Sequence, residues 1–496
     1  MPVVTSAVVP GPQSGSERKG EPEASWAQST KPTPPIEPDL LRRWDKDHLW
    51  HPFTAQADWA AGEPLIIDRA DGVELIDSEG KRYLDGVSSL WCNVHGHRHP
   101  TIDAAIREQL NLMAHSTLLG LTHRPGIELA RRLVEIAPEG LTRVFFSDNG
   151  ATAVEVALKM AFQYWRQRAN PEPERSMFIA LGGAYHGDTL GDVSLGGVDR
   201  FHEMFRPLLF PVLRAPIPFC YRCPLGLQRP GCGITCLDEV DRLLDAHQGR
   251  VAAVVVEPLV QGAAGMVVHP AGYLRGLRDI TRNHGTLLIA DEVAVGFGRS
   301  GKMFACEHEG ITPDFLCLAK GITGGYLPLA ATLTTEEVFS AFNSSAAEGK
   351  TFQHGHTYGG NPLGAAAALA TLRVFEEERT LEALGPKIEL LSRRLEEFTE
   401  LRHVGDVRQC GLMAGIELVL DRESKTEYPW HRQIGARVCL RARDLGLLIR
   451  PLGDVLVVMP PLSIREDQLN RMMDVMIRCV QEVTEPSQCG VDSMLL

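Results

Sequence analysis

Residues 287–293 read Leu-Leu-Ile-Ala-Asp-Glu-Val, and this stretch decides the fold. Four apolar residues end directly at two acids, Asp291 and Glu292. A carboxylate delivered at the end of a buried strand needs a cation or a hydrogen-bond donor opposite it. The stretch therefore predicts a buried β-strand that ends in a ligand site.

Similar short apolar runs recur along the middle of the chain, separated by helix-like stretches. They lie at residues 144–146, 177–180, 251–256 and 315–318. This alternation indicates a mainly parallel sheet covered by helices, and ligands bind such sheets beyond the carboxyl ends of the strands. We therefore expect an α/β fold whose site is formed by the residues that follow each run.

The length of the chain, 496 residues, exceeds one compact core and indicates a large domain with a smaller one. We expect a disordered tail at 1–38, an N-terminal segment of the small domain at 39–85, and a large domain at 86–362. A smaller α+β C-terminal domain is expected at 363–482, followed by a tail at 483–496, because amphipathic helices alternate with short strand-like runs after residue 363.

Composition excludes several classes of protein. A net charge of −13 disfavours nucleic acid and anionic membranes as partners, and no apolar run reaches the length of a membrane span. The first 38 residues are rich in Pro, Ser and Gly and contain four glutamates, which is untypical of secretion and transit signals. Together with eleven cysteines, these features predict a cytosolic protein with reduced thiols.

One group of cysteines has spacing that allows two interpretations. The spacing is C-x2-C-x8-C-x3-C, and its members are Cys220, Cys223, Cys232 and Cys236. Four thiolates could bind tetrahedral zinc. The stretch is also rich in Pro and Gly and lacks a paired ribbon pattern, which favours a surface insertion with free thiols. We therefore predict no metal site.

Two of the turns that follow apolar runs are candidates for cofactor contacts. Gly150 opens an amphipathic helix, where free backbone N–H groups and the helix dipole favour an anion. An ordinary capped turn is the alternative there. Tyr185 and His186 lie between glycines and could place a flat ring against a planar cofactor, or could form a plain loop.

Lys320 follows the apolar run 315–318. Burial disfavours the ammonium form of a lysine, so such an amine can attack an aldehyde and carry a proton. Taken alone, a surface lysine is the commoner outcome at a strand exit. Combined with Asp291, which would pair well with a protonated pyridine nitrogen, the two residues predict a catalytic site.

The sequence resembles the class III aminotransferases, which are fold-type I enzymes that use pyridoxal 5′-phosphate. The resemblance extends from about Trp50 to Pro461 and rests on residues 287–293, on Gly-Phe-Gly-Arg-Ser-Gly at 296–301, and on Lys320-Gly321. It implies a large domain with a mainly parallel sheet, a smaller α+β domain and a homodimer with its active sites at the interface.

Within that class, the sequence is similar to the branch that converts 8-amino-7-oxononanoate to 7,8-diaminononanoate in biotin synthesis. The segments that carry this likeness are 49–54, 85–89, 95–97, 304–308, 354–357 and 450–453. The likeness implies small-molecule substrates, with S-adenosylmethionine or L-lysine as the amino donor. The alternative is another class III enzyme, acting on an ω-amino acid or a diamine.

The resemblance assigns roles to seven residues around the cofactor. It implies that Lys320 holds pyridoxal phosphate covalently and that Asp291 contacts the pyridine nitrogen, keeping it protonated. Gly150 and Ala151 would offer backbone amides to the phosphate, and Tyr185 would stack on the ring. His356 and Thr357 would reach the phosphate from the other subunit of the dimer.

The resemblance also implies a substrate pocket. Arg450 would pair with the distal carboxylate of the keto acid, a bidentate role that suits a guanidinium. Two positions depart from the adenosylmethionine-using enzymes, which tend to have Tyr where this chain has Phe53 and Trp where it has Leu90. These departures resemble the lysine-using branch more closely. The expected substrate contacts are Phe53, Leu90, Trp91, Tyr185, Gly355 and Arg450.

Overall fold

The computed structural model describes residues 36–485, and these residues form two compact units that meet in the sequence between Ile66 and Ile67. In the first unit, helices α1 (Pro38–His48) and α2 (Gln56–Ala61) are linked through Asp45, which accepts a hydrogen bond from the Trp59 indole at 2.7 Å. The expected tails fall mainly on residues 1–35 and 486–496, which lie outside the described part.

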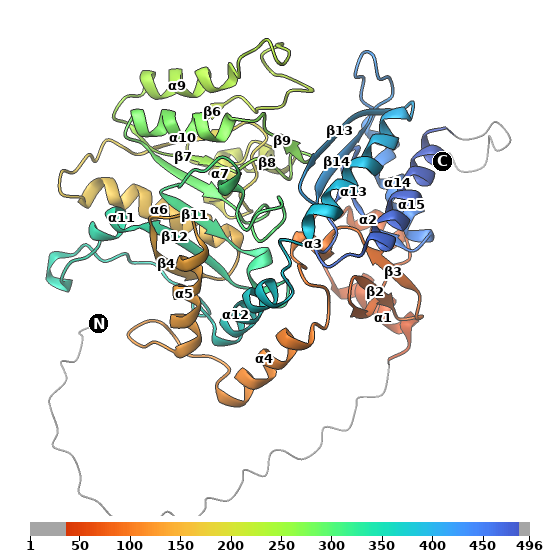
Figure 1. Cartoon of the computed structure of the whole chain (residues 1–496), viewed down its shortest axis with the longest axis horizontal. Coiled ribbons are helices and arrows are strands. Elements are labelled where there is room, and N and C mark those ends of the chain that lie inside the picture. The colour runs from red at the N-terminus through yellow and green to blue at the C-terminus, as the bar shows by residue number, and fades with distance from the viewer. Residues whose placement is uncertain (1–35, 486–496) are drawn as a thin grey trace, which may run out of the picture. The chain divides into compact units, whose positions relative to one another are not determined.

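The largest sheet of the second unit (Figure 1) has seven strands, in the order β4-β12-β11-β10-β7-β5-β6. The neighbours from β11 to β6 are parallel, and β12 is antiparallel to both β11 and β4. The strands are β4 (Leu141–Ser147), β5 (Met177–Leu181), β6 (Leu213–Ala215), β7 (Val251–Val256), β10 (Leu287–Asp291), β11 (Phe315–Leu318) and β12 (Ala330–Thr335). The predicted α/β fold with a mainly parallel sheet is confirmed.

Strand β10 shows why the sheet is buried on both faces. Leu287 and Ile289 belong to the apolar cluster that includes helix α6 (Gly150–Gln167). Leu288 and Ala290 belong to the other cluster, with helices α9 (Cys236–Ala246) and α10 (Tyr273–Asn283). Alternate side chains of a strand point to opposite faces, so helices cover both sides. Each buried Leu or Ile contributes about 1.5–3 kcal/mol.

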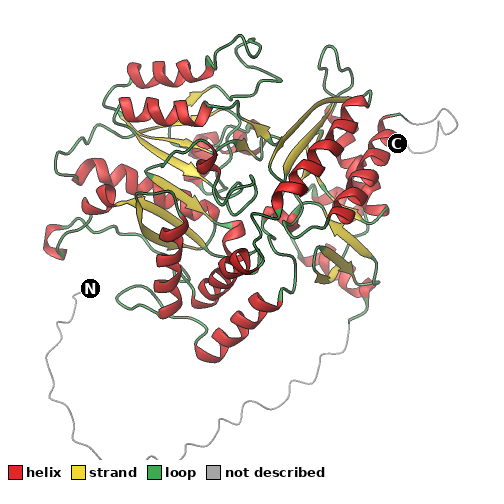
Figure 2. Ribbon diagram, in the orientation of Figure 1, coloured by secondary structure: helices red, strands yellow, loops and turns green. Residues whose placement is uncertain are grey.

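Smaller sheets lie beside the largest one (Figure 2). An antiparallel sheet contains β13 (Val404–Cys410), β14 (Met413–Leu418), β17 (Val455–Val458) and β16 (Arg450–Leu452). Another small sheet contains β1 (Ile67–Asp71), β2 (Glu74–Asp77), β3 (Arg82–Asp85) and β15 (Leu447–Leu448). β8 (Val260–Gln261) and β9 (Val267–Val268) form a hairpin. Pairing of β3 with β15 joins residues near 85 to residues near 447.

The remaining helices surround these sheets. They are α3 (Ser88–Trp91), α4 (Pro100–Leu112), α5 (Arg124–Ile136), α7 (Leu190–Leu195), α8 (Asp199–His202), α11 (Glu336–Ser340), α12 (Pro362–Glu377), α13 (Leu384–Glu396), α14 (Ile434–Asp444) and α15 (Glu466–Thr484). Across residues 36–485, none of the helices combines the length and apolar character that crossing a membrane requires.

Candidate active site

The end of β10 places Asp291 against a histidine. Asp291 is 4% exposed, and its Oδ2 lies 2.7 Å from Nδ1 of His186. Its Oδ1 accepts a hydrogen bond from the Val293 backbone N–H at 3.0 Å. Within the described chain, Nε2 of His186 is buried and has no hydrogen-bond partner. The carboxylate is therefore fixed in orientation by contacts on both oxygens.

The end of β11 places Lys320 at the same edge of the sheet, because β10 and β11 are parallel with Asp291 opposite Cys317. Lys320 has φ +42°, an unusual backbone conformation for a residue other than glycine. Its Nζ lies 5.6 Å from the centre of the Trp91 ring. Burial lowers the pKa of the amine, while the charges of Asp291 and Glu257 oppose that shift. The amine is thus held in a setting that favours its nucleophilic form.

Glu257 is a site residue that the sequence reasoning missed. It follows the end of β7 and accepts hydrogen bonds from the backbone N–H groups of Tyr185 at 3.2 Å and Gly262 at 2.9 Å. Burial raises its pKa to about 7. The available signal was the same one that identified Asp291, an acid directly after a buried apolar run. Glu257 ties the Tyr185 segment to the turn at Gly262.

The N-terminus of α6 forms another wall of the site. Asn149 caps the helix by accepting a hydrogen bond from the Thr152 backbone N–H at 3.1 Å. Gly150 packs so closely against Val293 that a Cβ on it would lie 2.6 Å from Val293 Cγ1. The first N–H groups of a helix have no partner within the helix, so this terminus can receive an anion.

These elements enclose a cavity of about 680 Å³, a volume typical of a site for a cofactor-sized ligand. Seven of the residues singled out from the sequence line it: Trp91, Gly150, Ala151, Tyr185, His186, Asp291 and Lys320. The Tyr185 hydroxyl donates to Asp188 Oδ2 at 2.8 Å, and burial raises the pKa of that hydroxyl. A nucleophilic amine, a fixed carboxylate, an aromatic ring and a helix N-terminus thus face one space.

The other predicted site residues of the second unit do not line this cavity. Leu90 is 51% exposed, and Arg450 is an exposed residue at the start of β16. Residues 355–357 lie in an exposed loop, where His356 Nδ1 is 2.7 Å from Oδ2 of Asp148, a cavity residue. Phe53 belongs to the first unit, where it is 64% exposed.

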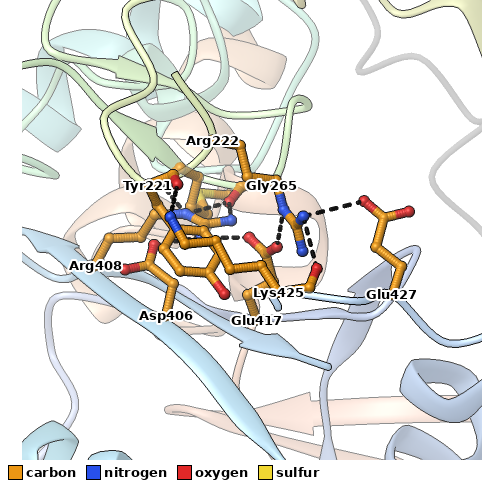
Figure 3. A network of polar contacts seen from close by, with 9 residues as sticks. Tyr221, Arg222, Gly265, Asp406, Arg408, Glu417, Lys425 and Glu427 are labelled. Atoms are coloured by element: carbon orange, nitrogen blue, oxygen red, sulfur yellow. Dashed lines mark hydrogen bonds and ion pairs between the residues drawn. The ribbon is translucent and has the colours of Figure 1, made fainter. Parts of the chain in front are cut away.

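A network of ion pairs and hydrogen bonds lies next to the turn between β8 and β9 (Figure 3). Arg408 donates to Glu417 at 2.8 Å and, through Nε, to the carbonyl of Gly265 at 2.9 Å. Arg222 donates to the same Glu417 at 2.6 Å. Gly265 belongs to the turn of the β8–β9 hairpin, and at Gly262 the same turn lies close enough that a Cβ would be 3.1 Å from the Trp91 ring. The network therefore connects the smaller antiparallel sheet to the Trp91 side of the cavity.

The four clustered cysteines lie apart from this cavity. Each is a free thiol, and all four line a small cavity of about 20 Å³: Cys220, Cys223, Cys232 and Cys236. Burial raises the pKa of Cys236 to about 11. Across residues 36–485, no three His, Cys, Asp or Glu side chains are grouped so that they could hold a metal ion.

Comparison with known proteins identifies relatives over nearly the whole chain. Residues 55–480 match the family described as aminotransferase class-III. The adenosylmethionine-8-amino-7-oxononanoate aminotransferase of Nitratidesulfovibrio vulgaris is 60% identical, over 91% of this chain and 83% of that protein. The crystal structure of the Methanocaldococcus jannaschii enzyme of the same name has a TM-score of 0.86 at 44% identity, covering 90% of this chain and 100% of that one. The Pseudomonas jessenii omega transaminase in complex with PMP has a TM-score of 0.86 at 32% identity, covering 90% and 98%.

Proposed function

The chain belongs to the class-III aminotransferase family, whose members use pyridoxal 5′-phosphate, and we propose that it converts 8-amino-7-oxononanoate to 7,8-diaminononanoate in biotin synthesis. One observation supports this choice of substrate: the 60% identity to an 8-amino-7-oxononanoate aminotransferase extends over 91% of the chain. A match of this length spans the segments that line the cavity, including the strand ends that hold Asp291 and Lys320.

The residues around the cavity fit pyridoxal phosphate. Lys320 supplies an amine for its aldehyde, and Asp291 supplies a carboxylate for its ring nitrogen. The N-terminus of α6, at Gly150 and Ala151, suits its phosphate. The Tyr185 ring can stack on the pyridine. We therefore assign these five residues to the cofactor.

The bound cofactor supplies an electron sink that stabilises charge at the carbon from which a proton is removed. Lys320 is suited to move that proton, since burial lowers the pKa of its amine. Asp291 keeps the ring nitrogen protonated, and the His186 contact at 2.7 Å holds its carboxylate in place.

We further propose a cytosolic homodimer in which His356 and Thr357 complete the phosphate site of the partner subunit. The loop that carries them is exposed in one protomer, although His356 contacts the cavity residue Asp148. Segment 115–121 lies close to this loop: Leu118 packs against Gly360, and the ring of His115 lies 4.9 Å from that of Tyr358. Leu119 and Leu121, next to Leu118, are 88% and 62% exposed. Exposed apolar residues of this kind favour burial by a second copy.

The amino donor is the finer part of the proposal. The relative named above carries adenosylmethionine in its name. Phe53 and Leu90 lack the hydroxyl and the second indole that could hold a sulfonium-bearing donor, which favours L-lysine. Likeness to the omega transaminase supports a second candidate, an ω-amino acid or diamine aminotransferase.

An assay of the cofactor-loaded protein tests this proposal. 8-Amino-7-oxononanoate is supplied with S-adenosylmethionine or with L-lysine, and 7,8-diaminononanoate is measured by mass spectrometry. We expect product with L-lysine. Product with adenosylmethionine alone would keep the reaction but overturn the lysine assignment. Absence of product with both donors, together with turnover of diamines, would favour the second candidate.

A further inference from the structure

A buried carboxyl group that the proposed reaction does not use lies behind the cavity wall. Asp192, in helix α7, has 0% exposure. Its Oδ2 is 2.9 Å from Thr189 Oγ1, and its Oδ1 is buried without a hydrogen-bond partner in the described chain. If Asp192 were ionised, a charged oxygen would be buried and unpaired, which is strongly unfavourable.

The Thr189 hydroxyl lies between two carboxyl groups. Its Oγ1 is 2.6 Å from Glu155 Oε1 as well as 2.9 Å from Asp192 Oδ2. A hydroxyl has one proton, so it cannot donate to both. Glu155 Oε1 also accepts the Gly191 backbone N–H at 3.0 Å, which identifies this oxygen as an acceptor. The contact with Asp192 is therefore favourable when Asp192 carries a proton and donates it to Thr189.

The charges that face Asp192 act in the same direction. They come from Glu155 on α6, from Asp188 in the segment between β5 and α7, and from Asp291 at the end of β10. Burial is the largest cause of the shift, and with these three acids it raises the pKa of Asp192 to about 9. A hydrogen bond donated by Thr189 to the Asp192 carboxylate would lower this pKa, but the shorter contact directs that hydroxyl proton to Glu155. Burial and the facing acids thus favour the uncharged form of Asp192 at neutral pH.

This carboxyl group touches the backbone segment that carries the site residues. A Cβ on Gly187 would lie 2.5 Å from Asp192 Oδ2 and 2.5 Å from Ala151 Cβ, so the Gly187 backbone is closely packed between them. Gly187 directly follows Tyr185 and His186, and Thr189 itself lines the cavity. The position of the Tyr185 and His186 side chains therefore depends on how Asp192 and Thr189 hold this segment.

We propose that Asp192 is a positioning residue that remains a neutral carboxylic acid and, through its hydrogen bond to Thr189, holds residues 185–189 against the cavity. Its effect on catalysis rests on the proposed function, whereas its charge state does not. An ionised Asp192 would face three other carboxyl groups and lose its donated hydrogen bond. The segment would then be released from its position.

The first test compares the holoenzyme with Asp192→Asn, because the asparagine amide is neutral and can still donate to Thr189. The folded state keeps a proton that the unfolded chain releases above the ordinary pKa of aspartate, so the stability of the parent falls as pH rises towards about 9. Relative to the variant, the folded-to-unfolded ratio of the parent should fall by up to about tenfold per pH unit. Asp279→Asn, an exposed change on α10, should follow the parent. Equal pH dependence of the parent and Asp192→Asn would overturn the proposal.

The second test separates the hydrogen bond from the charge. Asp192→Leu is neutral but cannot donate, so kcat should fall while Asp192→Asn retains activity. The infrared difference between the parent and Asp192→Asn at neutral pH should contain the carbonyl band of a protonated carboxylic acid, and a carboxylate band in its place would contradict the proposal. Unfolding and infrared measurements need no substrate. They therefore decide the charge state of Asp192 even if the proposed reaction is wrong.

Discussion

The buried strand ends and the exposed residues of the candidate site differ in what surrounds them. Asp291 and Lys320 lie at the ends of buried strands, where His186 and Trp91 contact them within one chain. His356 and Arg450 are exposed in the same chain. Burying the charged groups of the strand-end residues costs free energy, and contacts with specific partners in the fold offset that cost. The exposed residues have no such cost, so their roles depend on a second subunit or a ligand.

The largest effect should come from removing the strand-end amine. Lys320→Ala should lower kcat by about a thousandfold or more, because it removes both the attachment point of the cofactor and the group that moves the proton. Steady-state assays of the purified variant with either donor measure this. Lys46→Ala, an exposed change on α1, serves as the control. Retention of substantial activity by Lys320→Ala would be incompatible with the assigned site.

A smaller effect is expected at the exposed arginine. Arg450→Ala should raise KM for 8-amino-7-oxononanoate by about 10- to 100-fold with a smaller change in kcat, because a bidentate pair with the substrate carboxylate is lost. Arg450→Lys should recover part of that loss. Arg437→Ala, another exposed arginine of the same domain, should leave KM unchanged. An unchanged KM in Arg450→Ala would place the carboxylate elsewhere.

The smallest of these effects, about tenfold weaker cofactor binding, is expected for His356→Ala, since a hydrogen bond to a charged phosphate contributes about 1.5 kcal/mol. Mixing of variant subunits decides whether His356 contributes to the site of its own subunit or to that of its partner. A dimer of one Lys320→Ala and one His356→Ala subunit contains one site with both native residues if His356 acts across the interface. Cofactor affinity and activity should then recover on mixing. No recovery would show that His356 serves its own subunit.

The sequence predicted the strand-end residues because burial of a charge leaves a local signature. Asp291 and Lys320 each follow an apolar run directly, and the structure places both on the wall of one cavity. The same signature at residues 251–257 would have identified Glu257. The alternation of apolar runs and helices was enough to predict a mainly parallel sheet. It did not predict the order of the strands, which is a property of the whole fold.

Other features could not be read from local sequence, because they depend on contacts between distant residues. His186 and Asp291 are 105 positions apart, and the Arg408–Gly265 hydrogen bond spans 143. The neutral state of Asp192 depends on Glu155, which lies on a different helix. No periodicity or motif encodes such pairings. They become visible when the backbone has placed the partners together.

The point of covalent attachment tests the central assignment most directly. The holoenzyme is treated with borohydride, which fixes the cofactor to the amine that holds it, and the labelled peptide is located by mass spectrometry. The label should be found on Lys320 and be absent from the Lys320→Ala variant. A label on another lysine of an active enzyme, or an active enzyme with no label, would contradict the account.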